Sequence, residues 1–324
     1  MLVHDDHDPW TVPLEPQSQD PADLLRHAAH FALLAPSPGN SQPWHLHIAD
    51  DHVDLYTDLS RSRRAHDPDG QQRVVAGGAA LGLLRVALRA LSLAESTDLL
   101  PGDHPDLLAR VTLIGSVAPA PEDTWLLQAA PKRRTHRGPL AARPVRPRIL
   151  QRLAELAQET GTTFLELTAP AQRAALARRV DECLRYDESD PGRLAERAAW
   201  PTPGPEPFET TDGQPARGDA ILEGSPTLAL LATPGDTPHD WLLAGQTLIR
   251  VLLRARVDQL YASFLAGPLT RAADRWSVAE EAAVLGDMPQ SPGYAQLALR
   301  LGYGSDLPPV PRRPLADVLL ATPP

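Results

Sequence analysis

The same order of predicted elements occurs twice along this 324-residue chain. Each half begins with an amphipathic helix, continues to a long apolar helix and ends on a strand, as the spacing of apolar residues indicates. These elements cover residues 24–33, 74–91 and 107–114 in the first half and residues 149–157, 242–253 and 296–302 in the second. Because the sequence identity between the two halves is low, the alternative to a true repeat is a chance similarity between amphipathic helices. The repeated order predicts an α+β protein built from two similar halves.

Individual residues also predict how the first two helices begin and pack. Asp20 is a capping residue, and Pro21 suits the first position of a helix. The second helix carries only small residues over 77–80, with the sequence G-G-A-A. Since helix separation depends on the side chains at the contact, another helix is expected to approach closely there.

The second half is longer because a proline-rich stretch separates a helix near 171–186 from a strand over 227–232. A long stretch without periodicity inside a compact protein is usually either disordered or a functional lid. Trp200 and Phe208 favour the lid, since disordered segments are poor in aromatic residues. The predicted organisation is a flexible tail over 1–20, a first half over 21–120, and a second half over 121–324 that includes the lid insertion 187–224 and a C-terminal arm 303–324.

A proline-rich loop over residues 35–44, A-P-S-P-G-N-S-Q-P-W, joins the first helix to a short strand over 45–48. Its prolines restrict φ and remove backbone donors, while Gly39 accepts φ values that other residues avoid. The loop is therefore expected to hold Asn40 and Gln42 in set positions. Their carboxamides donate and accept hydrogen bonds, which suits a ligand edge such as the pyrimidine side of a flavin. An ordinary proline-rich connection is the alternative.

A cluster of positive charge, K-R-R-T-H-R over residues 132–137, occurs in a chain whose formal net charge is −10. Guanidinium groups bind phosphate oxygens at two points, and the hydroxyl of Thr135 adds a neutral donor. A solvated basic turn is the alternative. A second basic pair, Arg312 and Arg313, follows the sequence L-G-Y-G near the C-terminus.

Together these motifs resemble those of the nitroreductase superfamily. The pattern P-S-x-x-N-x-Q-P-W is similar to the loop that contacts the flavin in that family. The pattern R-R-T-x-R is similar to the R-R-S-x-R element that binds the FMN phosphate. The C-terminal segment resembles the family's closing strand and arm, from which Arg312 or Arg313 would reach the phosphate.

The distribution of the motifs adds to this resemblance. Nitroreductases are usually homodimers in which each FMN site combines the loop of one subunit with the basic element of the other. Here the loop occurs only in the first half and the basic element only in the second. This is similar to the Acg-type branch, single chains of two nitroreductase-like halves with a lid over one FMN. The resemblance implies a nitroreductase-like fold, an intramolecular pseudo-dimer and one FMN site.

In that family a backbone amide after the second central helix faces the flavin N5, and the matching stretch here is Leu265-Ala266-Gly267. Gly267 is the expected donor, and no side-chain nucleophile is expected. Active nitroreductases often carry an acidic residue where this chain has Ala266. The resemblance implies these FMN-binding residues: Pro36, Ser37, Asn40, Gln42, Arg133, Arg134, Thr135, Arg137, Leu265, Ala266, Gly267 and Arg312 or Arg313.

Composition argues against several other classes of protein. A net charge of −10 is unfavourable for nucleic-acid binding, and no apolar run approaches the ~20 residues that cross a bilayer. The single cysteine, Cys183, predicts a small buried side chain in a reducing compartment. Without a recognisable secretory signal at the N-terminus, the expected location is the cytoplasm.

No metal site is expected from the sequence. His45 and His47 share one face of a strand, but no cysteine or third histidine stands at a suitable spacing. The acidic, histidine-rich N-terminus is more often mobile than metal-binding. No G-x-G-x-x-G motif marks a separate nicotinamide site.

The resemblance implies an FMN-dependent oxidoreductase that takes electrons from NAD(P)H and reduces a small electron-poor acceptor, such as a nitro compound or a quinone. A non-catalytic protein that stores FMN under a closed lid is the alternative, which the insertion and Ala266 favour. The chain would act as a monomer with an internal pseudo-dimer or as a homodimer.

Overall fold

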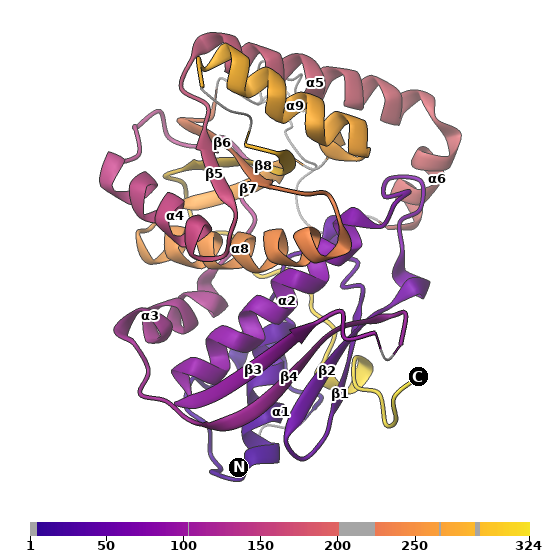
Figure 1. Ribbon diagram of the computed structural model, residues 1–324, viewed down its shortest axis with the longest axis vertical. Helices are drawn as coiled ribbons and strands as arrows, with labels where there is room; N and C mark the ends of the chain where they lie inside the picture. Colours follow the sequence, from indigo (N-terminus) through magenta and orange to yellow (C-terminus); the bar gives the residue numbers. More distant parts are fainter. Residues whose placement is uncertain (1–4, 103, 201–223, 266, 289–291) are drawn as a thin grey trace.

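The computed structural model describes residues 5–102, 104–200, 224–265, 267–288 and 292–324, and its two halves repeat one arrangement (Figure 1). The first half contains α1 (Pro21–Ala32), β1 (Trp44–Ile48), β2 (His52–Thr57), α2 (Gln71–Ala90), β3 (Leu93–Leu99) and β4 (Leu107–Ser116). The matching elements of the second half are α4 (Pro147–Glu159), β5 (Thr163–Glu166), β6 (Thr227–Thr233), α8 (Pro238–Val257), β7 (Tyr261–Leu265) and β8 (Tyr294–Gly302).

The strand order confirms the prediction of two similar α+β halves. Each half holds an antiparallel sheet of four strands, ordered β1-β2-β4-β3 in the first and β5-β6-β8-β7 in the second. The third and fourth strands of each half therefore exchange places in the same way. Further helices are α3 (Pro121–Ala129), which connects the halves, and α5 (Pro170–Ser189), α6 (Pro191–Ala199) and α9 (Ala272–Leu285). None of the described helices is both long enough and apolar enough to cross a bilayer.

The first helix begins at the predicted residues. A carboxylate oxygen of Asp20 accepts hydrogen bonds from the backbone N–H groups of Ala22 at 3.0 Å and Asp23 at 3.4 Å. Pro21 occupies the first turn, where the missing N–H costs no hydrogen bond. Leu25 and Ala28 on the apolar face are fully buried, so the predicted amphipathic helix packs as expected.

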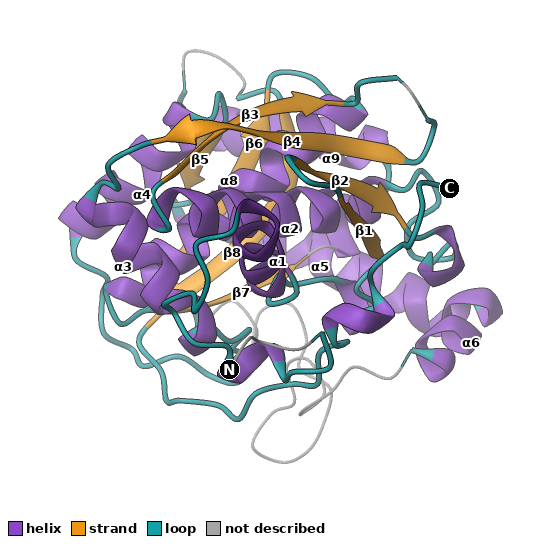
Figure 2. Cartoon of the chain, turned by 90° about the horizontal axis from the view of Figure 1, so that it is seen from below, coloured by secondary structure: helices purple, strands orange, loops and turns teal. Residues whose placement is uncertain are grey.

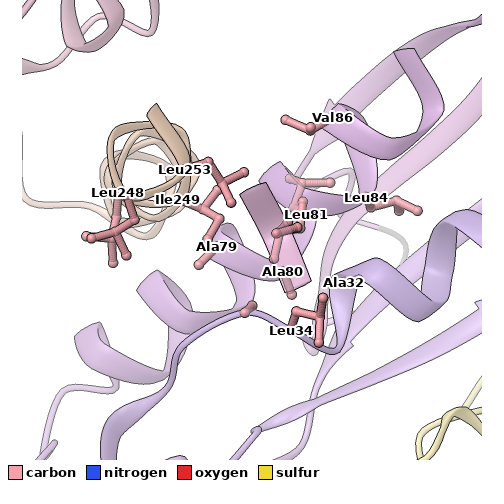
Figure 3. Close-up of a cluster of buried hydrophobic side chains, with 14 of the residues drawn as sticks. Ala32, Leu34, Ala79, Ala80, Leu81, Leu84, Val86, Leu248, Ile249 and Leu253 are labelled. Atoms are coloured by element: carbon pink, nitrogen blue, oxygen red, sulfur yellow. The ribbon is translucent and has the colours of Figure 1, made fainter. Parts of the chain in front are cut away.

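The two long helices α2 and α8 cross at the centre of the molecule, where glycines let their backbones meet. A Cβ atom on Gly245 would lie 2.1 Å from the carbonyl oxygen of Val75, and one on Gly78 would lie 2.4 Å from that of Leu242. Figure 3 shows apolar side chains of α2, α8 and the end of α1 around this region. The close approach predicted over 77–80 is confirmed, and the core is continuous across both halves.

The outer faces of the two sheets differ in how they are covered. Helices α1 and α2 lie on one side of the first sheet (Figure 2), and its strand β1 alternates between buried and partly exposed residues. In the second sheet, α5 and α9 also cover the outer face, with Val180 and Val278 in one cluster with Leu228 and Leu230. Strand β6 is therefore buried along its whole length. The outer face of the first sheet remains polar.

The stretch predicted as a structureless lid, 187–224, begins with helical residues. Helix α5 runs to Ser189 and α6 follows at once, so this part of the prediction is wrong. Pro191 stands at the start of α6, and a carboxylate oxygen of Asp190 accepts from the backbone N–H of Arg193 at 2.9 Å. Proline and aspartate here begin a helix rather than interrupt one. Residues 201–223, including Phe208, lie outside the described residues.

Helix α6 contacts the first half of the chain. The carboxylate of Glu196 accepts hydrogen bonds from the backbone N–H groups of Ala65 and His66, each at 3.0 Å. The guanidinium carbon of Arg61 lies 4.9 Å from the centre of the Trp200 ring. Trp200 thus packs on the protein, as its aromatic character predicted.

Buried His30 makes the fold sensitive to acid. Its side chain on α1 is 0% exposed, and burial lowers its pKa from 6.5 to about 4. Between these values the unfolded chain gains a proton that the folded chain does not, so stability is lost as the pH falls. We expect this single group to cost about 2 kcal/mol at pH 5, and His30→Leu to remove that loss. Urea unfolding of both proteins at pH 7 and pH 5 measures the difference; equal losses would exclude His30 as the cause.

Candidate functional site

The proline-rich loop and the basic cluster, far apart in sequence, meet in the structure. Nη2 of Arg133 donates to the carbonyl oxygen of Leu34, just before the loop, at 3.4 Å. Nη2 of Arg312, in the C-terminal arm, donates to the same oxygen at 3.5 Å. Arg133 is only 4% exposed, and its Nη1 donates to the Thr135 hydroxyl at 3.4 Å. One carbonyl group of the first half therefore binds two cations of the second.

Arg133, Arg134 and Arg312, which we call the arginine cluster, carry positive charge, and the carboxylate of Asp306 offsets part of the charge of Arg134. Within the described part of the chain none of them forms an ion pair, and each Nε is buried without a hydrogen-bond partner. Burial and the charge of Arg134 lower the pKa of Arg133 to about 10. Burial and the other two charges lower the pKa of Arg312 well below its usual value. Because guanidinium groups keep their proton in proteins, the cluster favours an anion with several oxygens, such as phosphate.

Arg313, the other predicted candidate in the arm, is placed differently. Its Nη1 lies 3.6 Å from a carboxylate oxygen of Asp58 and donates to the carbonyl oxygen of Gln42 at 3.2 Å. The charge of Arg313 is thus partly compensated within the protein. Of the two arginines, Arg312 is the one whose charge belongs to the arginine cluster.

Trp10, which the sequence analysis did not select, covers the arginine cluster. The centre of its ring lies 3.9 Å from the guanidinium carbon of Arg134 and 5.2 Å from that of Arg312. Its indole N–H donates to the carbonyl oxygen of Val310 at 2.7 Å. Such a ring attracts cations and excludes water from them. In the sequence, the only indication that Trp10 covers these arginines is a tryptophan next to a proline within the predicted tail.

The segment around Trp10 is packed on the protein. Pro9 and Val12 are buried, and a carboxylate oxygen of Asp5 lies 2.6 Å from Nη1 of Arg26. The predicted flexible tail over 1–20 is therefore wrong for this segment, because apolar burial and an ion pair hold it to the first half. Residues 1–4 lie outside the described residues.

The proline-rich loop has an uncommon backbone conformation, and its carboxamides bind the C-terminal arm. Asn40 and Gln42 have φ values of 54° and 49°, which non-glycine residues adopt rarely. The Ser37 hydroxyl accepts from the backbone N–H of Gln42 at 2.8 Å, while buried Pro36 precedes it. The Gln42 side-chain oxygen accepts from the backbone N–H of Arg313 at 2.8 Å.

Asn40 is engaged by the arm through both ends of its carboxamide. Its Nδ2 donates to the carbonyl oxygen of Pro311 at 2.8 Å, and its Oδ1 accepts a hydrogen bond from Arg312. The first role of these two carboxamides is therefore to hold the arm against the loop. Each keeps a further N–H and a further lone pair for a ligand.

The basic cluster is aligned with strand β7. Thr135 pairs with Ala262 in an isolated parallel bridge, and the backbone N–H of His136 donates to the carbonyl oxygen of Ala262 at 2.9 Å. Strand β7 then leads to Leu265, which is buried, and on to Gly267. Arg137 is partly buried at the end of the cluster. Ala266 lies outside the described residues.

Close packing requires a glycine at position 267, which the sequence analysis did not predict. A Cβ atom on it would lie 2.6 Å from Sγ of Cys183 on α5. Burial raises the pKa of the Cys183 thiol to about 12, so the group stays neutral. Cys183 is therefore a packing residue beside the Gly267 backbone, although it is partly exposed rather than fully buried as predicted.

Arg275 on α9 holds the segment after Gly267 and was also missed. Its side chain is 0% exposed, and Nη1 donates to the carbonyl oxygen of Leu269 at 3.2 Å. Its Nε lies 2.9 Å from a carboxylate oxygen of Asp236, and its Nη2 lies 2.6 Å from one of Asp69. Asp69 belongs to the first half, so this network ties the two halves together. An arginine on an amphipathic helix gives no sequence signal for such burial.

Comparison with known proteins finds relatives of similar length. No model of a protein family matches the sequence. The chain is 29% identical to the Mycobacterium tuberculosis protein "Putative NAD(P)H nitroreductase Rv3131", over 92% of this chain and 91% of that one. It is 27% identical to "Putative NAD(P)H nitroreductase acg" of the same organism, over 94% and 97%. A crystal structure of a "putative nitroreductase" from Anabaena variabilis is similar to 90% of this chain and 91% of that chain, with a TM-score of 0.58. The sequences are 10% identical, so this likeness shows the shared fold.

Proposed function

Because this chain belongs to the nitroreductase superfamily, as an Acg-type protein of two similar halves, we propose that it is an FMN-dependent oxidoreductase with one FMN site. The observation that carries the proposal is the arginine cluster. Three guanidinium groups meet where the loop of one half joins the basic element of the other, and none of them forms an ion pair with a carboxylate of the described residues. A bound phosphate monoester would supply the missing negative charge.

Both halves of the chain would contribute residues to the proposed FMN site. Arg133, Arg134 and Arg312 would hold its phosphate, with the Thr135 hydroxyl as a neutral donor. The second half would also contribute Arg137, Leu265, Ala266 and the backbone of Gly267 toward the flavin ring, while Pro36, Ser37, Asn40 and Gln42 would border it from the first half. FMN, when bound, supplies the redox centre between NAD(P)H and a small electron-poor acceptor, such as a nitro compound or a quinone.

Anaerobic mixing of the FMN-loaded protein with NADPH or NADH tests the activity. We expect rapid bleaching of the flavin absorbance, and its return when a nitro compound or a quinone is added. Purified protein that neither carries FMN nor takes it up would overturn the proposal.

A storage protein that shields FMN is the second candidate function. Trp10 favours it, because the ring covers two arginines of the cluster and so closes one side of the site. The same mixing experiment separates the two functions. Flavin absorbance that persists under excess NAD(P)H would indicate storage, whereas bleaching within the mixing time would indicate an enzyme.

Trp10 is expected to slow the release of FMN. In Trp10→Leu the arginine cluster loses its aromatic cover and becomes open to water, so we expect FMN to dissociate about 10-fold faster, as the loss of one to two cation–π contacts predicts. Flavin fluorescence after dilution measures the rate. Trp125→Leu is the matched control, because Trp125 is 49% exposed on α3. Equal rates in all three proteins would exclude Trp10 from the site.

A further inference from the structure

The outer face of the first sheet carries a cluster of two histidines and a carboxylate from neighbouring strands. His47 on β1 pairs directly with Asp54 on β2, and His52 stands at the start of β2. One ring nitrogen of each histidine and one carboxylate oxygen of Asp54 all lie within 4.8 Å of one another. The distance from Nε2 of His52 to Oδ2 of Asp54 is 3.9 Å.

The groups in this cluster are arranged as ligands rather than as hydrogen-bond partners of one another. Nδ1 of His47 is buried and has no hydrogen-bond partner among the described residues. Nδ1 of His52 lies 2.8 Å from a carboxylate oxygen of Asp51, which favours the proton on that nitrogen. Nε2 of His52 then carries a lone pair and lies 3.9 Å from a carboxylate oxygen of Asp54, an arrangement that a cation near both atoms would stabilise.

Neighbouring residues orient the cluster. Nε of Arg110 donates to one oxygen of Asp54 at 2.7 Å, and its Nη2 donates to the other at 2.8 Å. The second of these oxygens, Oδ2, also accepts from the Tyr56 hydroxyl at 3.3 Å, so of the two oxygens Oδ1 keeps a lone pair for a metal ion. A carboxylate on the second nitrogen of a histidine, as Asp51 provides for His52, is typical of metal-binding histidines.

We propose that His47, His52 and Asp54 form a binding site for a divalent transition-metal ion of the Zn²⁺ class. Imidazole nitrogens and a carboxylate oxygen suit Zn²⁺, which binds them at about 2.0–2.2 Å in a tetrahedron. Ligand atoms on such a tetrahedron lie about 3.4 Å apart, so separations of up to 4.8 Å must shorten by at most about 1.4 Å. Water would fill the fourth position.

The proposed metal site departs from the sequence-based expectation of no metal centre, and it is separate from the proposed FMN site. His45 and His47, two residues apart, appeared to lack a third ligand. The partners of His47 come instead from β2, through strand pairing that histidine spacing does not reveal. His45 does not join them, because its Nε2 lies 3.0 Å from a carboxylate oxygen of Asp58.

Calorimetric titration of the full-length protein with ZnCl₂ tests the proposal. We expect one class of sites that weakens at least 10-fold in His47→Gln and in His52→Gln, as the loss of a ligand or its support predicts. His45→Gln is the matched control on the same face of the same strand and should bind as the wild type does.

A second measurement shows that each variant is folded. Thermal unfolding without metal should be alike in the wild type and all variants, and ZnCl₂ should raise the midpoint only where the site is intact. Zinc binding that is unchanged in His47→Gln, or that His45→Gln weakens equally, would overturn the proposal. So would the absence of zinc binding to the wild type.

Discussion

Replacement of Arg133 by methionine is expected to weaken FMN binding by about 100-fold, as loss of a buried charged hydrogen-bond donor predicts. The same change should leave the FMN-free protein at least as stable as the wild type. Arg133 is 4% exposed and lies beside two other cations, so its removal relieves repulsion when no anion is present. Flavin fluorescence titration measures the affinity, and urea unfolding of the FMN-free protein measures the stability.

The opposite signs of these two effects make the experiment specific. A buried arginine that merely supported the fold would lose stability and FMN together when replaced. Arg148→Met, an exposed arginine on α4, is the matched control and should change neither quantity. Unchanged FMN affinity in Arg133→Met would contradict the placement of the phosphate at the arginine cluster.

Gly245→Ala is expected to destabilise the protein by about 3 kcal/mol or more, as overpacking at a close helix crossing predicts. In an ordinary helix the same change is favourable by about 0.5–1 kcal/mol. Here the added Cβ would lie 2.1 Å from the carbonyl oxygen of Val75 and 2.8 Å from Cα of Gly78. Both neighbours are backbone atoms of α2, so the helices must move apart along the centre of the molecule.

The free energy of unfolding, measured in urea, checks this effect. Gly138→Ala is the matched control, because the nearest atom to its Cβ, Cε1 of His136, lies at 3.5 Å, an ordinary contact distance. We expect the control to stay within about 0.5 kcal/mol of the wild type. If Gly245→Ala were equally neutral, the contact between α2 and α8 would have to be looser than the structure shows.

Local patterns predicted the elements whose cause is local. The cap at Asp20 and the amphipathic face of α1 each depend on neighbours within a few positions. The repeated element order likewise predicted the two halves, since each helix and strand carries its own periodicity. The meeting of the loop with the basic cluster was predicted only through the resemblance to a family in which two such motifs form one site.

Predictions failed where distant contacts decide the conformation. The tail around Trp10 is packed because of Arg134 and Val310, and nothing within residues 1–20 indicates those partners. The start of the proline-rich insertion is a local failure, because Asp190 and Pro191 begin a helix that the sequence analysis did not predict. Arg275, which the sequence analysis did not select, is buried because Asp69 and Asp236, from distant parts of the chain, form ion pairs with it.

By itself, the sequence determined the α+β class, the two halves and the residue types that a phosphate and a flavin require. Periodicity, capping and side-chain chemistry are properties of short segments, which a linear chain displays directly. Only the tertiary structure decided that Arg313 lies near the carboxylate of Asp58, whereas Arg312 forms no ion pair among the described residues. It also placed Arg133 against the carbonyl oxygen of Leu34. It also placed His47 beside Asp54. Charge balance and ligand geometry depend on distances in space, because a partner on another strand or arm is invisible until the chain is folded.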